Sequence, residues 1–178
     1  IHRDGGLADY VIVPQKQAFP LPTSLDPAFG AFCEPLACCI HGTDVAQIQP
    51  GSTVLVLGGG VIGLLTVQLA KLAGANVMLA TRNKAKRDLA LRLGATAVID
   101  PAATDITAEI QSLSHGGADV VMECAGVPET VEQAPKLARP GGRVVIVGVL
   151  AQGLKVQYEP FDLLFREIDI RTSFLNPY

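Results

Sequence analysis

The chain has 178 residues, of which 49% are hydrophobic and 17% are charged, and its formal net charge at pH 7 is −3. This length suits a domain with a well-buried core, and so apolar a composition excludes a disordered chain. The small negative charge and the lack of a long basic run argue against nucleic-acid binding, so any anion site must be local.

The first 50 residues are irregular and rich in proline. Residues 9–14 predict a short β-rich segment that a proline closes, and further prolines interrupt the chain as far as Pro27. Small and apolar residues over 30–48 predict a helix that ends at the Gln49-Pro50-Gly51 turn.

From residue 51 onward, strand and helix patterns alternate. The predicted strands are 53–57, 76–80, 97–99, 119–122, 143–147 and 168–174, and the predicted helices between them are 61–73, 84–93, 105–113 and 129–137. Because parallel strands need crossover connections, this order predicts an α/β fold with a doubly wound parallel sheet of about six strands.

One apolar run, residues 54–70, is almost long enough to span a membrane. Three consecutive glycines interrupt it, and polar residues follow them. A strand, a tight turn and a buried helix explain the run better, so no membrane association is expected.

A glycine-rich turn follows the strand at 53–57 and opens the next helix. It consists of Gly58, Gly59, Gly60, Val61, Ile62 and Gly63, which fits the dinucleotide-binding pattern GxGxxG. In that pattern the first glycine permits the turn, the second lets a pyrophosphate approach the backbone, and the third lets helix and strand pack closely. An ordinary glycine-rich turn is the alternative, whereas a P-loop is excluded because no Lys-Ser/Thr pair follows.

The end of the second strand indicates which dinucleotide binds. An acidic residue is expected there to accept from a ribose 2′-hydroxyl, but Thr81 occupies the position and Arg82 follows it. Lys86 and Arg87 lie one turn into the next helix. A hydroxyl and cations favour a 2′-phosphate, so the sequence predicts NADP(H) over NAD(H). A solvated basic face at the start of a helix is the alternative.

The four cysteines, Cys33, Cys38, Cys39 and Cys124, include no CxxC pair. A disulfide framework is therefore not expected, and a reducing, cytoplasmic environment is the default.

Several stretches match one family in order along essentially the whole chain. They are Gly5-Gly6-Leu7-Ala8-Asp9-Tyr10, Glu34-Pro35-Leu36, His41-Gly42, Gly51, the Gly58 to Gly63 turn, Leu93-Gly94-Ala95, Pro140-Gly141-Gly142 and Val147-Gly148-Val149. The ordered set resembles the zinc-containing medium-chain alcohol dehydrogenase family, particularly its polyol (sorbitol) and threonine dehydrogenases.

The resemblance implies a division of the chain. Residues 1–35 would be the C-terminal piece of a leading, GroES-like catalytic segment with its linker, and residues 36–178 a dinucleotide-binding Rossmann domain. The upstream zinc ligands and the returning catalytic segment would lie outside this chain. We therefore expect no catalytic residue within it, and cofactor binding without turnover by this chain alone.

The resemblance also implies individual roles. Glu34 matches a glutamate that approaches the catalytic zinc in the intact enzyme, although a helix-starting Glu is the alternative and this chain alone is expected to hold no zinc. Ile62 matches a residue behind the nicotinamide ring. Val147 and Val149 match residues whose backbone addresses the nicotinamide end, and Cys124 with Ala125 matches a loop lining the cofactor cleft. Core packing is the alternative role.

For the intact enzyme, the resemblance implies hydride transfer between an alcohol or ketone and nicotinamide C4, with zinc polarising the substrate oxygen. It also implies a homodimer through the edge strand 168–174. A zinc-independent quinone or enoyl reductase and a non-catalytic dinucleotide-binding module remain alternatives; Glu34-Pro35-Leu36 favours the zinc branch.

Overall fold

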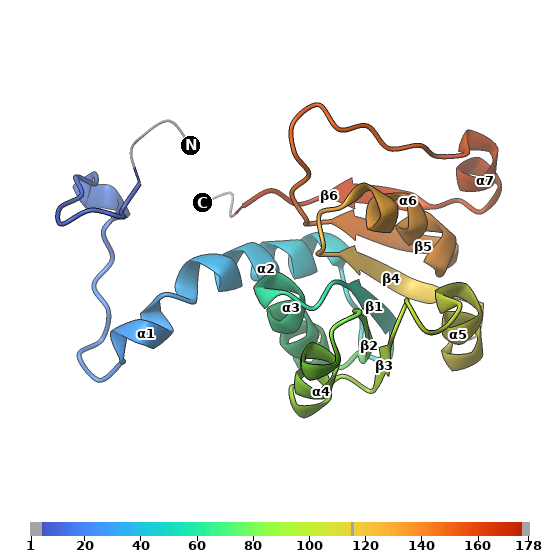
Figure 1. The fold of residues 1–178 in the computed structure, drawn as a ribbon, viewed down its shortest axis with the longest axis horizontal. Coiled ribbons are helices and arrows are strands. Elements are labelled where there is room, and N and C mark those ends of the chain that lie inside the picture. Colours follow the sequence, from blue (N-terminus) through green and yellow to red (C-terminus); the bar gives the residue numbers. More distant parts are fainter. Residues whose placement is uncertain (1–4, 115, 176–178) are drawn as a thin grey trace. The chain divides into compact units, whose positions relative to one another are not determined.

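The computed structural model describes residues 5–114 and 116–175. The chain divides into two compact units, Ile1–Cys33 and Glu34–Tyr178 (Figure 1). The division falls just before the boundary after residue 35 that the sequence suggested. That the first unit belongs to a catalytic domain stays a prediction.

The first unit contains little regular structure. Its elements are the 3-10 turn η1 (Gln15–Gln17) and the short helix α1 (Pro27–Gly30). The prediction of a β-rich segment at residues 9–14 is wrong, because none of these residues belongs to a strand. Tyr10 and Ile12 are 92% and 91% exposed. A strand needs a neighbour to complete its hydrogen bonds, and the strand pairs of the described chain all lie in the second unit.

The second unit is built on a parallel sheet of six strands, as expected. The structure adds the strand order, which is β3-β2-β1-β4-β5-β6. The strands are β1 (Thr53–Leu57), β2 (Asn76–Ala80), β3 (Ala97–Ile99), β4 (Ala118–Glu123), β5 (Ala138–Ile146) and β6 (Asp169–Thr172). Their inner residues are almost continuously apolar because both faces of the sheet are covered.

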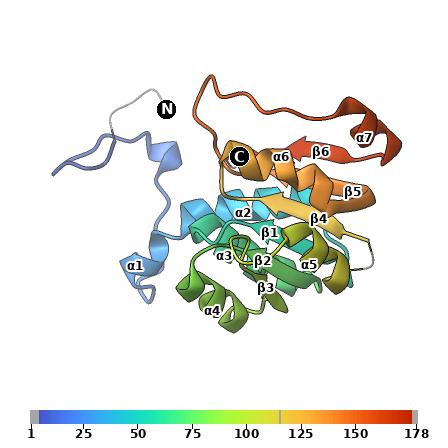
Figure 2. The ribbon, with the colours of Figure 1, turned by 45° about the vertical axis from the view of Figure 1, so that its right-hand side comes forward.

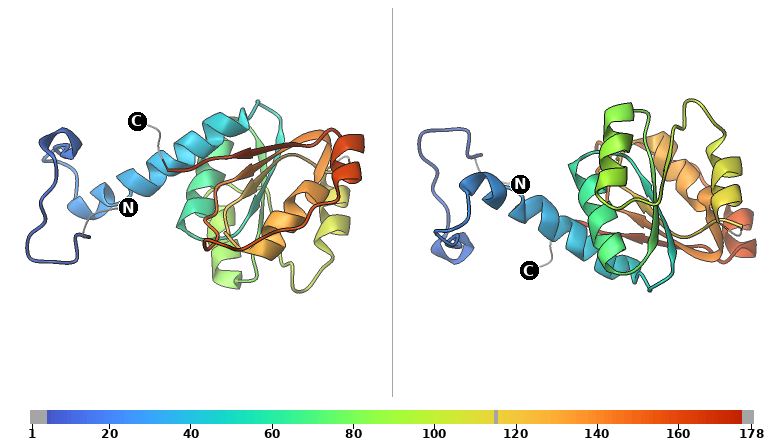
Figure 3. Two further views of the ribbon diagram at one scale, coloured as in Figure 1. Left: turned by 90° about the horizontal axis from the view of Figure 1, so that it is seen from above. Right: turned by 90° about the horizontal axis from the view of Figure 1, so that it is seen from below.

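Helices cover the two faces of this sheet (Figures 2 and 3). They are α2 (Cys33–Ala46), α3 (Val61–Leu72), α4 (Lys84–Arg92), α5 (Ile106–Leu113), α6 (Pro128–Leu137) and α7 (Pro160–Phe165). One core contains residues of α2, α3 and α4 packed with Val54, Val56 and their strand neighbours. The other contains residues of α5 and α6 packed with Leu55 and Leu57. Alternate residues of each strand thus enter opposite cores.

Several predicted boundaries move in the structure. The helix expected over 30–48 begins at Cys33 and ends at Ala46, because Gln47 adopts a positive φ of 52°. The helix expected at 105–113 begins one residue later, since Asp105 caps it by accepting from the Thr107 amide at 2.9 Å. The strand expected at 168–174 is limited to Asp169–Thr172, and α7 was not predicted.

Strand β5 begins at Ala138 rather than at residue 143. Ala118 pairs with Ala138 but Val120 pairs with Arg143, so the residues between bulge out of the ladder. The Pro140-Gly141-Gly142 stretch that matched the family lies in this bulge. Gly141 adopts a φ of 70° there, and its amide donates to the Arg166 carbonyl at 2.8 Å.

The apolar run at 54–70 is divided between β1, the glycine turn and α3, as predicted. In the part of the chain that the structure describes, no helix has both the length and the apolar character that a bilayer crossing requires.

Candidate functional site

The glycine turn joins the carboxyl end of β1 to the start of α3. Gly58 has a φ of 105°, and a Cβ on it would lie 3.0 Å from Ala125. A Cβ on Gly63 would overlap the Gly58 carbonyl oxygen. Both positions therefore require glycine, the first for its backbone conformation and the second for the close approach of helix to strand.

Gly60 faces open space in contrast, because a Cβ placed there would have no atom within 4 Å. It is the N-cap of α3, and no side chain caps that helix. The first-turn N–H groups of a helix have no partner within the helix and lie at its positive end. The turn thus offers an accessible anion-binding site at the uncapped N-terminus of α3.

Two of the predicted adenosine-end residues lie directly beside this turn. A Cβ on Gly59 would be 3.0 Å from Thr81 Cγ2 and 3.2 Å from Lys86 Cβ. Arg82 and Lys86 are exposed. The turn, the end of β2 and the start of α4 therefore meet at one place, with two cations available to solvent.

Arg87 behaves differently from its basic neighbours. Its Nη1 donates to the Thr81 carbonyl at 2.6 Å, and its Nη2 pairs with Asp100 Oδ2 at 2.8 Å. Its side chain is only 15% exposed. Arg87 thus holds the segment after β2 against the end of β3. Of the three predicted cations, Arg82 and Lys86 face solvent. Lys84, which is also exposed, pairs with Asp88 at 2.7 Å.

The predicted nicotinamide-end residues lie after β4 and β5. Ala125 contacts Gly58, and Gly126 has a φ of 68° with its Cβ position 2.9 Å from the Val149 carbonyl oxygen. Val149 is 75% exposed, whereas Val147 packs against the core. The structure thus brings Ala125, Val149 and the glycine turn to the same carboxyl edge of the sheet.

Sequence reasoning missed one residue at this edge. Glu123, the last residue of β4, is fully buried. Its Oε1 accepts from the Ala125 amide, the Gly126 amide and the Thr130 hydroxyl at 2.8, 2.9 and 2.7 Å. An acid that ends an apolar strand three residues before a glycine is the signal that would have marked it.

The thiols of Cys39 and Cys124 lie against α3 without serving as nucleophiles. Cys39 of α2 donates to the Ile62 carbonyl at 3.4 Å, and burial raises its pKa to about 11. Cys124 lies 3.9 Å from Thr66 Oγ1, and burial raises the pKa of its thiol as well. Both thiols stay protonated at neutral pH, so their contribution is packing against α3, Cys39 at Ile62 and Cys124 at Thr66.

Glu34 lies in the first turn of α2, where its Oε1 accepts from the Cys38 thiol at 3.4 Å. Burial, with help from the neighbouring Glu34 carboxylate, raises the pKa of Cys38. Within residues 5–114 and 116–175, no group of three or more His, Cys, Asp or Glu side chains is placed to hold a metal ion. A zinc site normally needs three protein ligands, so these residues do not form one by themselves.

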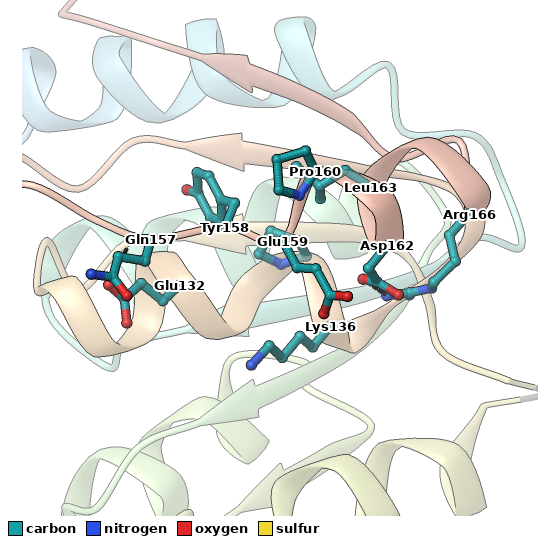
Figure 4. Close-up of a pocket in the computed structure, with 10 residues that line it drawn as sticks. Glu132, Lys136, Gln157, Tyr158, Glu159, Pro160, Asp162, Leu163 and Arg166 are labelled. Carbon is teal, nitrogen blue, oxygen red and sulfur yellow. Dashed lines mark hydrogen bonds and ion pairs between the residues drawn. The ribbon is translucent and has the colours of Figure 1, made fainter.

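A cavity of about 690 Å³ lies between α6 and residues 157–166, away from the glycine turn (Figure 4). Some of its polar groups are paired: Glu132 accepts from the Gln157 amide at 2.8 Å, and Arg166 pairs with Asp162 at 3.0 Å. Lys136 and Glu159 also line it. None of the predicted cofactor residues lines it.

Comparison with known proteins identifies relatives of the whole chain. The family model for zinc-binding dehydrogenases matches residues 61–177. An uncharacterized zinc-type alcohol dehydrogenase-like protein of Escherichia coli K12, YdjJ, is 37% identical over 172 residues, which cover 96% of this chain and 49% of that protein. Galactitol 1-phosphate 5-dehydrogenase of the same strain is 34% identical over 179 residues, which cover 98% of this chain and 51% of that enzyme.

A solved structure is more similar still. A dehydrogenase described as zinc-binding, from Sinorhizobium meliloti 1021 and bound to NADP, is 60% identical with a TM-score of 0.91. The match covers 100% of this chain and 53% of that one. The chain thus spans about half the length of the relatives that it matches.

Proposed function

This chain belongs to the zinc-binding dehydrogenase family, and we propose that it forms the nicotinamide-dinucleotide-binding domain of an enzyme that transfers hydride between an alcohol or ketone and the coenzyme. The observation that carries this proposal is the glycine turn after β1. Gly63 lies against Gly58, Gly60 is open, and α3 begins uncapped. Strand order reverses between β1 and β4, and doubly wound sheets bind ligands in the crevice at that point.

The coenzyme's pyrophosphate would sit on the N-terminus of α3, at Gly58, Gly59, Gly60 and Val61. The helix dipole and the free N–H groups favour its charge there, and the bare Gly60 lets it approach the main chain. When bound, the nicotinamide ring supplies the hydride-accepting or hydride-donating carbon. The residues of this chain bind and orient it.

NADP(H) is the proposed coenzyme. Thr81 places no negative charge at the end of β2, and the exposed Arg82 and Lys86 stand beside the glycine turn. These groups suit a 2′-phosphate, which an acid at residue 81 would repel. The NADP bound in the Sinorhizobium meliloti relative supports this preference.

The nicotinamide end would lie near Ile62, the Cys124-Ala125 loop, Val147 and Val149. Ala125 contacts Gly58 and Val149 contacts Gly126, so this loop joins the phosphate seat to the end of β5. The apolar side chains would exclude water from the ring while the main chain offers polar atoms to it.

Zinc belongs to the whole enzyme in this proposal. Glu34 is the candidate ligand that this chain contributes, and its remaining partners would come from segments outside the chain. Because the described residues do not form a zinc site alone, we expect this chain by itself to bind coenzyme without turnover.

The proposal includes an assembly, a location and a class of partner. Strand β6 ends the sheet, and an open parallel edge favours pairing with a second copy, so we propose a homodimer through residues 168–174. The four cysteines are free, and we propose a cytoplasmic location, where thiols stay reduced. The partners are small molecules, not nucleic acid or a membrane.

The test uses the full-length protein that contains this chain. We expect oxidation of members of a panel of secondary alcohols with NADP⁺, faster than with NAD⁺, and loss of activity after chelation of the metal. Chelator-resistant reduction of a quinone or enoyl substrate would favour the zinc-independent branch. Coenzyme binding with no turnover of any alcohol or ketone would favour the non-catalytic module.

A further inference from the structure

Glu123 connects several segments of the proposed coenzyme crevice. Its side-chain Oε1 accepts from the amides of Ala125 and Gly126 and from the Thr130 hydroxyl. These donors belong to the loop after β4 and to the first turn of α6. The loop that is proposed to line the nicotinamide end is therefore held by one carboxylate oxygen.

The main chain of the same residue holds the other side of the crevice. The Glu123 carbonyl accepts from the amides of Val147 and Gly148, each at 2.9 Å. These two residues follow β5, where the ring-facing backbone is proposed. Glu123 thus bonds to both loops that would enclose the nicotinamide.

The two loops approach each other closely at this residue. A Cβ on Gly148 would lie 2.5 Å from Glu123 Oε2 and would overlap the Gly126 amide nitrogen. The spacing between the loops is therefore set at Glu123, Gly126 and Gly148, with no room for an added methyl group.

A buried carboxylate is not expected where a side chain serves only to fill space. Glu123 has no exposed surface, and its Oε2 has no hydrogen-bond partner among the described residues. Burying a charged group is unfavourable unless its hydrogen bonds are strong, and bonds to an ionised acceptor are stronger than those to a neutral one. Three donors converge on Oε1, and an ionised Glu123 would hold them more strongly than a neutral side chain would.

We propose that Glu123 is a positioning residue for the nicotinamide half of the coenzyme site: it sets the conformation of the loop after β4 against the loop after β5. This inference rests on the proposed function. The adenosine half, at Thr81, Arg82 and Lys86, lies at the end of β2 and is not bonded to Glu123. The two halves of the site should therefore respond differently to substitution of Glu123.

The experiment measures two dissociation constants on the full-length protein. One ligand is NADPH, and the other is ADP-ribose 2′-phosphate, which lacks the nicotinamide. For Glu123→Gln, which keeps the side-chain size but weakens the bonds to Oε1, we expect NADPH to bind about tenfold more weakly, as for the loss of one charge-assisted hydrogen bond. Binding of ADP-ribose 2′-phosphate should stay within about twofold of the wild type.

Two further variants keep the test decisive. Thr130→Val removes one donor to Oε1 and should shift the ratio of the two constants in the same direction by a smaller factor, even where Glu123→Gln does not fold. Asp119→Asn is the matched control: it neutralises an acid at the opposite end of β4 that bonds to the Thr53 amide and to Arg139, so it should lower the melting temperature and leave the ratio unchanged.

Each outcome has a separate meaning. An equal loss of affinity for both ligands, or an unchanged ratio in Glu123→Gln and Thr130→Val, overturns the positioning role while the proposed function stands. Failure of the wild-type protein to bind either ligand overturns the proposed function itself.

Discussion

Gly63 stands so close behind Gly58 that a single added methyl group would overlap the Gly58 carbonyl oxygen. The carbonyl belongs to the turn and cannot move aside as a flexible side chain could. This contact fixes the distance between β1 and α3, and with it the position of the N–H groups at the start of the helix.

Two alanine substitutions in the same turn should affect different properties, one the stability and the other the affinity for NADPH. Gly63→Ala must push the helix away from the strand, so we expect a loss of about 1–3 kcal/mol in the free energy of unfolding, as for overpacking elsewhere. Gly60→Ala meets no atom within 4 Å, so the melting temperature should be unchanged while NADPH binds at least about tenfold more weakly. Thermal unfolding and fluorescence titration check the pair. Normal NADPH affinity in Gly60→Ala would contradict a phosphate seat at this turn.

The choice between the two coenzymes should depend on Arg82. Arg82→Ala removes an exposed guanidinium beside Thr81, so we expect a loss of about tenfold in NADPH affinity, typical of a charge-assisted hydrogen bond, with little change for NADH. Arg92→Ala, at the far end of α4, is the control for a general loss of positive charge. Calorimetric titration with both coenzymes measures the effect; an equal change for NADH and NADPH would show that Arg82 does not read the 2′-phosphate.

Asp119 should make folding sensitive to acid. Burial opposes ionisation of this carboxyl group, but the Thr53 amide and the Arg139 guanidinium outweigh it and lower its pKa below the ordinary 3.8. A pKa lowered by folding contributes stability that is present above pH 3.8 and is lost as the pH falls through the lower folded value. Asp119→Asn should therefore be less stable than the wild type at pH 7, with a smaller difference near pH 3. Urea unfolding at both pH values gives the two differences, and equal differences would refute the assignment.

Zinc content should distinguish this chain from the full-length protein. We expect metal analysis of this chain, residues 1–178, to find no stoichiometric zinc, because Glu34 provides one ligand of the three that a site requires. In the full-length protein, Glu34→Ala should lower zinc retention during dialysis against a chelator, while NADPH affinity stays at the wild-type value. Glu129→Ala, which also removes an acid from the first turn of a helix, is the control. Stoichiometric zinc on the isolated chain would contradict the expected division of ligands.

Much of the fold follows from local sequence patterns. The apolar runs at β1 and β2 and the glycines after β1 each act over a few residues, so their consequences can be predicted directly from the sequence. The expected strand at residues 9–14 failed for the opposite reason. Its composition favours a strand, but a strand forms only where a neighbour completes its hydrogen bonds, and composition does not reveal the neighbour.

The alternating α/β architecture, the glycine turn and the absence of an acid at residue 81 were already evident from the sequence, because they depend on periodicity and on residues adjacent in the chain. The pairing of Arg87 with Asp100 and the bonds of Glu123 to the loops after both β4 and β5 became visible only in the folded chain. Those contacts join segments that the parallel crossovers bring to one edge of the sheet. Their partners are set by strand order and register, which no local pattern encodes.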